Sequence, residues 1–158
     1  MKVQELMTKQ VFTGTDRQTL NDAAQIMWEH NCGCVPVLSA ENRHLVSVIT
    51  DRDIAMASYI NGKCLSDIPV MVAHSKRAIV VQPQDDIDAV EKIMQSNQIR
   101  RIPVIDEASL VVGIVSLNDI AMASKVNHSE VSAEDVSSTL AAISRKKSSE
   151  PSRMVAAV

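Results

Sequence analysis

Aromatic side chains are nearly absent from this chain of 158 residues, in which Phe12, Trp28 and Tyr59 make up only 2% of the total. Proteins that bind single-stranded nucleic acid stack bases on aromatic side chains, so this scarcity argues against such a role. The formal net charge is −3 and the sequence pI is about 5.8, which leaves no broad positive field to attract nucleic acid or anionic lipid. Nucleic acid is therefore disfavoured as a partner.

Long apolar runs are missing as well. No stretch of about 18 consecutive apolar residues is present, so we expect no membrane partner. The first residues also lack the apolar segment of a signal peptide. The three cysteines are too few for a disulfide framework, which favours a cytoplasmic location with reduced thiols.

Common catalytic motifs are a further absence. The sequence contains no Gly-x-x-x-x-Gly-Lys, His-Glu-x-x-His or Gly-x-Ser-x-Gly pattern, so we expect no enzyme, no catalytic residue and no required cofactor. His30, Cys32 and Cys34 lie close together and leave a metal site or a thiol switch open as an alternative. No second ligand pair accompanies them, so we expect no metal and interpret the thiols as buried or incidental.

Internal repetition organises what is there. The hexapeptide Asp-Ile-Ala-Met-Ala-Ser at 53–58 recurs unchanged at 119–124, an offset of 66 residues. Pro-Val at 36–37 recurs at 103–104, an offset of 67. The length difference falls in the turn-like stretch 39–44, where insertions are well tolerated. We therefore divide the chain into a first repeat at 1–62, a second repeat at 63–125 and a tail at 126–158.

Each repeat carries the same order of predicted elements, β-α-β-β-α. Alone, a unit of this size with three strands is marginally stable, so the two should bury their sheets against each other. The prediction is an α/β (α+β) fold in which the repeats pack as a pseudo-two-fold pair. The expected elements are a strand at 11–13, a helix at 20–27, strands at 35–38 and 45–50 and a helix from Asp51, then a strand at 78–81, a helix at 87–94, strands at 101–105 and 110–116 and a helix from Leu117.

The tail differs in composition from the repeats. Ser132 and Asp135 form a cap-like start, and apolar residues follow at helical spacing, which predicts an amphipathic helix within 129–145. The stretch 146–152 is typical of a loose tail, and the apolar end at 154–158 is a candidate for docking.

A hydroxyl and a carboxylate three residues apart mark the end of a strand in both repeats: Thr50 with Asp53, and Ser116 with Asp119. This spacing is close to the capping box, in which the two side chains only begin a helix. The same geometry suits a ligand, because a carboxylate at a strand end can accept hydrogen bonds from both hydroxyls of a ribose. Both interpretations stay open.

Two arginines begin a strand of the second repeat. A guanidinium offers a rigid fork of donors for phosphate oxygens, but neighbouring strand residues point to opposite faces, so we expect at most one of Arg100 and Arg101 to reach a given cleft. The first repeat has Gly33 and Cys34 at the matching positions, so the two clefts should differ in phosphate affinity.

Both repeats resemble cystathionine beta-synthase (CBS) domains, and the pair resembles a Bateman module. The stretch Val-Gly-Ile-Val-Ser-Leu-Asn-Asp-Ile at 112–120 is close to the family's most typical strand-to-helix signature, and the resemblance covers about residues 1–125. It implies regulatory binding of an adenosyl ligand between the repeats, such as AMP, ADP or ATP, with S-adenosylmethionine or NAD as further candidates. It also implies a homodimer.

Carried over onto this sequence, the resemblance implies two clefts. Ser47 stands where the second repeat has Gly113, and Cys34 stands where it has Arg101, so we rank the cleft of the second repeat's Ser-Asp pair as the main one. Its expected ligand-binding residues are Thr13, Cys32, Gly33, Arg101, Ser116 and Asp119. The expected residues of the second, weaker cleft are Thr50, Asp53, Val80, Ile99 and Arg100.

The sequence thus predicts a small regulatory module that senses an adenine nucleotide between its repeats and signals to an effector protein in trans. A ligand-free dimeric scaffold is the main alternative, and a thiol, metal or RNA binder is a weaker one.

Overall fold

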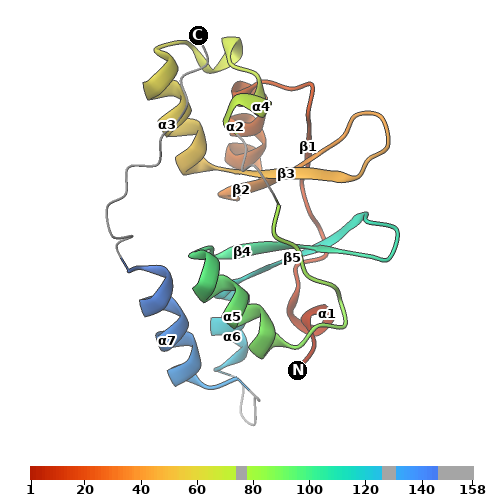
Figure 1. Cartoon of the computed structure of the whole chain (residues 1–158), viewed down its shortest axis with the longest axis vertical. Helices are drawn as coiled ribbons and strands as arrows, with labels where there is room; N and C mark the ends of the chain where they lie inside the picture. Colours follow the sequence, from red (N-terminus) through yellow and green to blue (C-terminus); the bar gives the residue numbers. More distant parts are fainter. Residues whose placement is uncertain (74–77, 126–130, 146–158) are drawn as a thin grey trace.

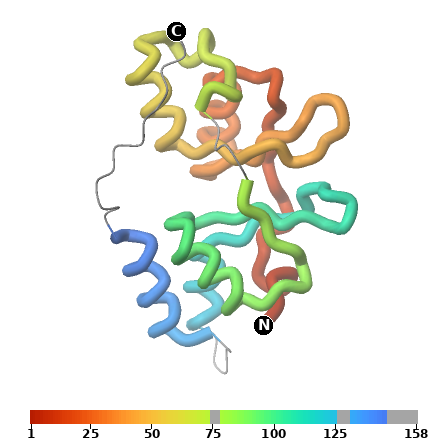
Figure 2. Tube along the Cα trace, in the orientation of Figure 1, coloured from red at the N-terminus to blue at the C-terminus, as the bar shows by residue number. Residues whose placement is uncertain are grey.

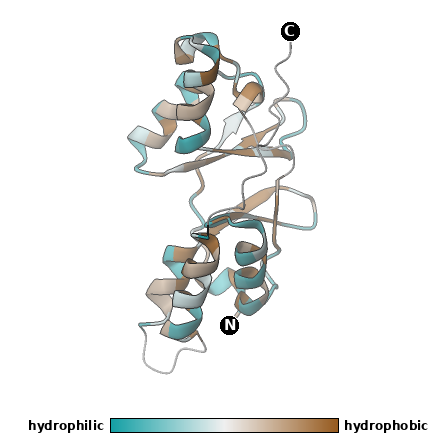
Figure 3. Ribbon diagram, turned by 60° about the vertical axis from the view of Figure 1, so that its left-hand side comes forward, coloured by the Kyte–Doolittle hydropathy of each residue, from teal (hydrophilic) through white to brown (hydrophobic). Residues whose placement is uncertain are grey.

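The computed structural model describes residues 1–73, 78–125 and 131–145. Two small β-sheets lie one above the other at the middle of the molecule, and the helices cover their outer sides (Figure 1). The strands at the centre are predominantly hydrophobic (Figure 3). One face of each sheet is buried against helices, and the opposite face is turned toward the second sheet. The predicted mixed α/β fold built from two repeats is confirmed.

The first repeat contains a three-stranded sheet. Its strand order is β1-β2-β3, with β1 parallel to β2 and β2 antiparallel to β3. Pro36 is tolerated inside the central strand because the short strand β1 pairs only with Val37 and Leu38. The elements are β1 (Gly14–Thr15), α2 (Leu20–Glu29), β2 (Cys34–Leu38), β3 (Leu45–Thr50) and α3 (Asp51–Asn61).

The second repeat follows the same plan with a smaller sheet. Strands β4 and β5 pair antiparallel, and the register places Arg101 beside Ser116. The predicted tail helix is present as α7, which begins at a Ser132–Asp135 capping box and packs along α5. The elements are α5 (Ile87–Asn97), β4 (Arg101–Ile105), β5 (Val111–Ser116), α6 (Leu117–Ala123) and α7 (Ala133–Ile143).

The first predicted strand of each repeat was wrong in extent. In the first repeat the strand begins at Gly14, after the apolar stretch 11–13, and in the second only Val81 forms a bridge, to Val104. The apolar character of Val11 and Phe12 has another cause, because both side chains line a cavity between the repeats.

The N-terminal segment belongs to the core of the second repeat. Helix α1 (Val3–Leu6) lies beside β5 and α6, and the N-terminus is found in the second repeat's half of the molecule (Figure 1). The Val3 N–H donates to Asp85 O at 3.0 Å, and the Ile87 N–H donates to Met1 O at 3.1 Å. The Lys2 ammonium pairs with the Asp86 carboxylate at 2.9 Å, which raises the pKa of Lys2 and lowers the pKa of Asp86.

The segment between the repeats packs on the first repeat, as the N-terminal segment packs on the second, so the two repeats exchange short segments. After a 3₁₀ turn (Leu65–Asp67), helix α4 (Val70–Ala73) lies on the first repeat. The Val70 N–H donates to Gln18 O, and the Leu20 N–H donates to Ile68 O, both at 2.9 Å. These bonds match those of the N-terminal segment, shifted by 67 residues. Figure 2 shows the result as a red N-terminal tube beside the green and cyan second repeat.

Two hydrophobic cores result, and each contains residues contributed through this exchange. The fully buried Val3 packs with Ile102 and Ile120 in the second repeat, whereas Ile68 and Val70 pack in the first. Each repeat therefore needs a segment that lies in sequence outside its own α-β-β-α run.

Val3→Ala tests the exchange. Removing two methyl groups from a fully buried side chain should lower the free energy of unfolding by about 2 kcal/mol, measured by urea denaturation. The control is Gln4→Ala in the same helix, where the side chain is exposed and the change should stay within about 0.5 kcal/mol. Equal effects of the two substitutions would show that α1 is not part of the core.

Gly113 and Ser47 occupy matching positions in the two repeats but differ in their surroundings. A Cβ atom at Gly113 would lie 2.5 Å from Sδ and 3.0 Å from Cγ of Met7, so the N-terminal segment requires a glycine there. Ser47 is fully buried, and its hydroxyl has no hydrogen-bond partner among the residues that the structure describes. Burying an unpaired hydroxyl costs free energy.

Alanine at these two positions should therefore have opposite effects. Ser47→Ala removes an unpaired polar group and should raise the free energy of unfolding by about 1 kcal/mol. Gly113→Ala forces Met7 to move and should lower it by about 1–3 kcal/mol. Chemical denaturation of both variants measures the signs. A destabilised Ser47→Ala would mean that the hydroxyl does have a partner.

Candidate functional site

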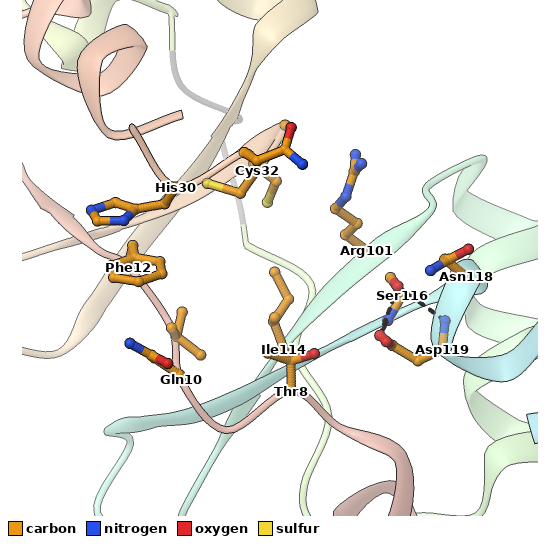
Figure 4. Close-up of a pocket in the computed structure, with 14 residues that line it drawn as sticks. Thr8, Gln10, Phe12, His30, Cys32, Arg101, Ile114, Ser116, Asn118 and Asp119 are labelled. Atoms are coloured by element: carbon orange, nitrogen blue, oxygen red, sulfur yellow. Dashed lines mark hydrogen bonds between the residues drawn. The ribbon is translucent and has the colours of Figure 1, made fainter. Parts of the chain in front are cut away.

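A cavity of about 540 Å³ lies between the two repeats (Figure 4). This volume falls in the range of small-molecule sites in proteins. One wall comes from the second repeat, a second wall comes from the first repeat, and the segment between α1 and β1 closes a third side. The lining residues are Arg101, Ile114, Ser116, Asn118 and Asp119 from the second repeat, His30, Asn31, Cys32, Gly33 and Cys34 from the first, and Thr8, Gln10, Val11 and Phe12 from the connecting segment.

The wall of the second repeat is built where β5 passes into α6. Ser116 ends the strand and begins the helix, so its side chain and that of Asp119 lie at the carboxyl end of the strand. Strand pairing brings Arg101 beside Ser116. This wall therefore offers a hydroxyl, a carboxylate and a guanidinium from three neighbouring points of the backbone.

Ser116 and Asp119 form a capping box. The Ser116 hydroxyl donates to Asp119 Oδ2 at 2.6 Å, and the Ser116 N–H donates to the same oxygen at 2.8 Å. The Asp119 N–H donates to Ser116 Oγ at 3.2 Å. Within the described part of the chain, Asp119 Oδ1 accepts no hydrogen bond. Capping therefore occupies one carboxylate oxygen and leaves the other available to a ligand.

An aromatic pair stands on the opposite side of the cavity. The rings of Phe12 and His30 stack with centroids 3.4 Å apart and planes inclined by 2° (Figure 4). Phe12 comes from the connecting segment, and His30 caps the end of α2. The stack fixes the segment that closes the cavity against the first repeat.

Arg101 reaches across the seam to the first repeat. A Cβ atom on Gly33 would lie 3.4 Å from Nη2 and 3.6 Å from Nη1 of Arg101, and 3.1 Å from Oδ2 of Asp51. Glycine at this position thus leaves room for two charged groups from different repeats. Among residues 1–73, 78–125 and 131–145, no carboxylate lies within ion-pair distance of the guanidinium, so its donors face the cavity uncommitted.

Cys34 lies at the inner edge of the cavity. Burial raises the pKa of its thiol to about 12, although the positive charge of Arg101 acts in the opposite direction. A thiol with this pKa stays protonated and is a poor nucleophile at neutral pH. Cys32 is half-buried and Cys64 is exposed. No group of three or more His, Cys, Asp or Glu side chains able to hold a metal ion occurs in the described residues.

The structure brings together five of the six residues predicted for the main cleft. Cys32, Gly33, Arg101, Ser116 and Asp119 all line the cavity, whereas Thr13 does not. Their role as ligand contacts stays a prediction. The sequence did not assign Phe12 or Asn118 to this cleft, and it singled out His30 only for the alternative of a metal site or thiol switch. The rarity of aromatic residues was the one signal that could have drawn attention to Phe12.

The residues predicted for the second cleft do not line the cavity described above. Thr50 and Asp53 form a capping box, with the hydroxyl donating to Asp53 Oδ2 at 2.6 Å. Val80 and Ile99 are half-buried and Arg100 is exposed. The segment 74–77, which leads into the strand region of Val80, lies outside the described residues, so this cleft also stays a prediction.

The fold and cavity define a tandem-repeat module with a ligand-sized space at the seam. The CBS domain family model matches the chain twice, over residues 3–59 and 65–125, and the chain belongs to this family. A curated relative is the CBS domain-containing protein YhcV of Bacillus subtilis, 37% identical over 131 residues, covering 83% of this chain and 91% of that protein.

Two solved structures extend the comparison. The CBS domain pair of protein MJ0100, in complex with 5′-methylthioadenosine and S-adenosyl-L-methionine, has a TM-score of 0.67 and 29% identity, covering 77% of this chain and 94% of that one. Hypoxic Response Protein I, with two coordinated zinc ions, has a TM-score of 0.69 and 30% identity, covering 77% and 98%. None of the helices described in this chain is long and apolar enough to cross a membrane.

Cys34 and Cys64 should differ in reactivity. At pH 8 iodoacetamide should alkylate the exposed Cys64, whereas Cys34 stays unmodified, because its pKa of about 12 leaves almost no thiolate. Raising the pH from 7 to 9 should leave Cys34 protected. Peptide mass spectrometry measures both sites in the same sample. Labelling of Cys34 at a comparable rate would contradict the buried environment described above.

Proposed function

We propose that this protein is a cytoplasmic regulatory module that binds an adenosyl ligand of the AMP, ADP or ATP type in the cavity between its repeats. The single observation that carries the proposal is the open cavity itself, in which a carboxylate oxygen, a hydroxyl and an arginine of one repeat face the backbone of the other. The adenosyl ligands named for the related MJ0100 domain pair support the same chemistry.

Each group has a distinct part in this binding. Asp119 Oδ1 accepts hydrogen bonds from the ribose hydroxyls, and Arg101 binds phosphate oxygens. The base lies toward the first repeat, near Cys32 and Gly33. S-adenosylmethionine and NAD share the adenosyl group and remain further candidate ligands. The cavity is assigned binding and no reaction.

A ligand that touches both repeats can act as a signal. It stabilises whichever arrangement of the pair it fits better, with a coupling on the order of 1–3 kcal/mol. We propose that the module acts as a homodimer and passes this shift to an effector protein in trans. The alternative is a scaffold that binds no ligand, and the opening that the described residues leave at the seam speaks against it.

Asp119→Ala tests the site. The substitution removes the proposed ribose acceptor and should weaken binding of adenosine and AMP at least about tenfold, measured by isothermal titration calorimetry. It also removes a helix cap, which costs about 0.5–2 kcal/mol of stability. Asp53→Ala, in the cleft ranked second, should weaken binding less.

The α7 helix supplies a matched control for the cap. Asp135 forms the same capping box with Ser132, and neither residue lines the cavity. Asp135→Ala should therefore lose similar stability and leave ligand affinity unchanged. Equal loss of affinity in both variants would reduce Asp119 to a structural role. No binding of any adenosyl ligand at millimolar concentration by the unmodified protein would favour the scaffold.

The position of the tryptophan makes its fluorescence unsuitable for measuring ligand binding. Trp28, the only tryptophan, is 88% exposed and does not line the cavity. Calorimetry or the shift of the thermal midpoint with ligand concentration is the appropriate measurement.

A further inference from the structure

We propose that Asp51 is a specificity-determining residue of this cavity: facing Arg101 beside Gly33, it limits the negative charge that a bound ligand can carry and favours a nucleoside monophosphate over a triphosphate. The inference rests on the function proposed above and concerns which phosphate esters the same site accepts. Asp51 itself does not line the cavity and acts at a distance, through its negative charge beside Gly33.

The Asp51 carboxylate and the Arg101 guanidinium both lie close to Gly33. Asp51 Oδ2 lies 3.1 Å, and Arg101 Nη2 lies 3.4 Å, from the position of a Cβ atom on Gly33. Strand pairing explains the meeting, because Cys34 at the start of β2 pairs with Thr50, the residue immediately before Asp51. The other oxygen of Asp51 accepts the Arg52 N–H at 2.7 Å, which holds the carboxylate in place.

The charges around the cavity are unevenly distributed. Among the described side chains that line it, Arg101 is the only one with a permanent positive charge, and Asp119 contributes a negative one. Asp51 and Asp53 are close enough to Cys34 to act on its thiol, as Arg101 does. These two carboxylates add negative charge beside the wall that Arg101 reaches.

This balance discriminates between ligands by their charge. A phosphate monoester carries a charge of about −1.5 to −2 at pH 7, of which one guanidinium neutralises about one unit. Each further phosphate adds negative charge that meets no additional cation among the described residues lining the cavity, and that charge is repelled by Asp51. Because Asp51 is exposed, solvent and salt weaken the repulsion, so we expect a preference of about three- to tenfold for AMP over ATP.

The test compares ligands on the full-length protein by titration calorimetry with adenosine, AMP and magnesium-free ATP at fixed ionic strength. The unmodified protein should bind AMP more tightly than ATP. Asp51→Asn keeps the size of the side chain and the acceptor for the Arg52 N–H, and should shift the ratio of the two dissociation constants about three- to tenfold toward ATP. Adenosine affinity should stay unchanged, and added salt should shrink the difference between the two proteins.

Glu134→Gln is the matched control. Glu134 is exposed in the first turn of α7 and away from the cavity, so the substitution changes the net charge equally. It should leave the AMP-to-ATP ratio unaltered. An unaltered ratio in Asp51→Asn, or the same shift in Glu134→Gln, overturns the role of Asp51. Binding of adenosine with an unaltered ratio sinks this inference alone, whereas absence of all binding by the unmodified protein sinks the proposed function with it.

Discussion

The reciprocal exchange of short segments is the constraint on which the rest of the structure depends. Backbone hydrogen bonds tie residues 1–3 to the second repeat and residues 68–70 to the first, at positions related by a constant shift along the chain. Among the exchanged residues, the apolar side chains of Val3, Ile68 and Val70 are fully buried or nearly so. Neither repeat completes its hydrophobic core without the segment that it receives in this exchange. The relative position of the two sheets is therefore set by core packing as well as by contact between the sheets.

The cavity follows from this arrangement. Once α1 is fixed on the second repeat, the chain must travel back past the seam to begin β1, and the connecting segment becomes a wall of the cavity. The stacking of Phe12 on His30 then holds that wall against α2. The same backbone path that completes a hydrophobic core therefore also encloses a space of ligand size.

The ligand recognition proposed for Ser116 and Asp119 uses the same residues as helix capping and does not compete with it. Ser116 and Asp119 begin α6 with hydrogen bonds that need one oxygen of the carboxylate, and that bonding also fixes the direction of the other. The identical Ser132–Asp135 arrangement in α7 shows that the motif alone does not indicate a ligand site. What distinguishes Asp119 is its place at the seam.

Much of the fold was readable from the sequence because both repeats carry the same hexapeptide and the same order of elements. Strands such as 45–50 and 101–105, and the helix beginning at Asp51, were predicted to the residue. Ser116, Asp119 and Arg101 could be named from the ends of the predicted strands, whereas Cys32 and Gly33 were named from the resemblance to CBS domains. Local pattern could not show that Val3 packs in the distant repeat, since its four-residue helix is stabilised by tertiary contacts. Local pattern likewise predicts a strand at Val11 and Phe12, because it cannot show that these residues line a cavity between the repeats.

The position of α1 has a mechanical consequence. The hydrogen bonds of Met1 and Val3 connect the N-terminus to α5 and to the loop before it. A pulling force applied at residue 1 therefore acts first on the second repeat. A tether at the N-terminus would extract a core side chain from the second repeat before it strained the first. Anything attached upstream would pull on the wall that carries Ser116 and Asp119.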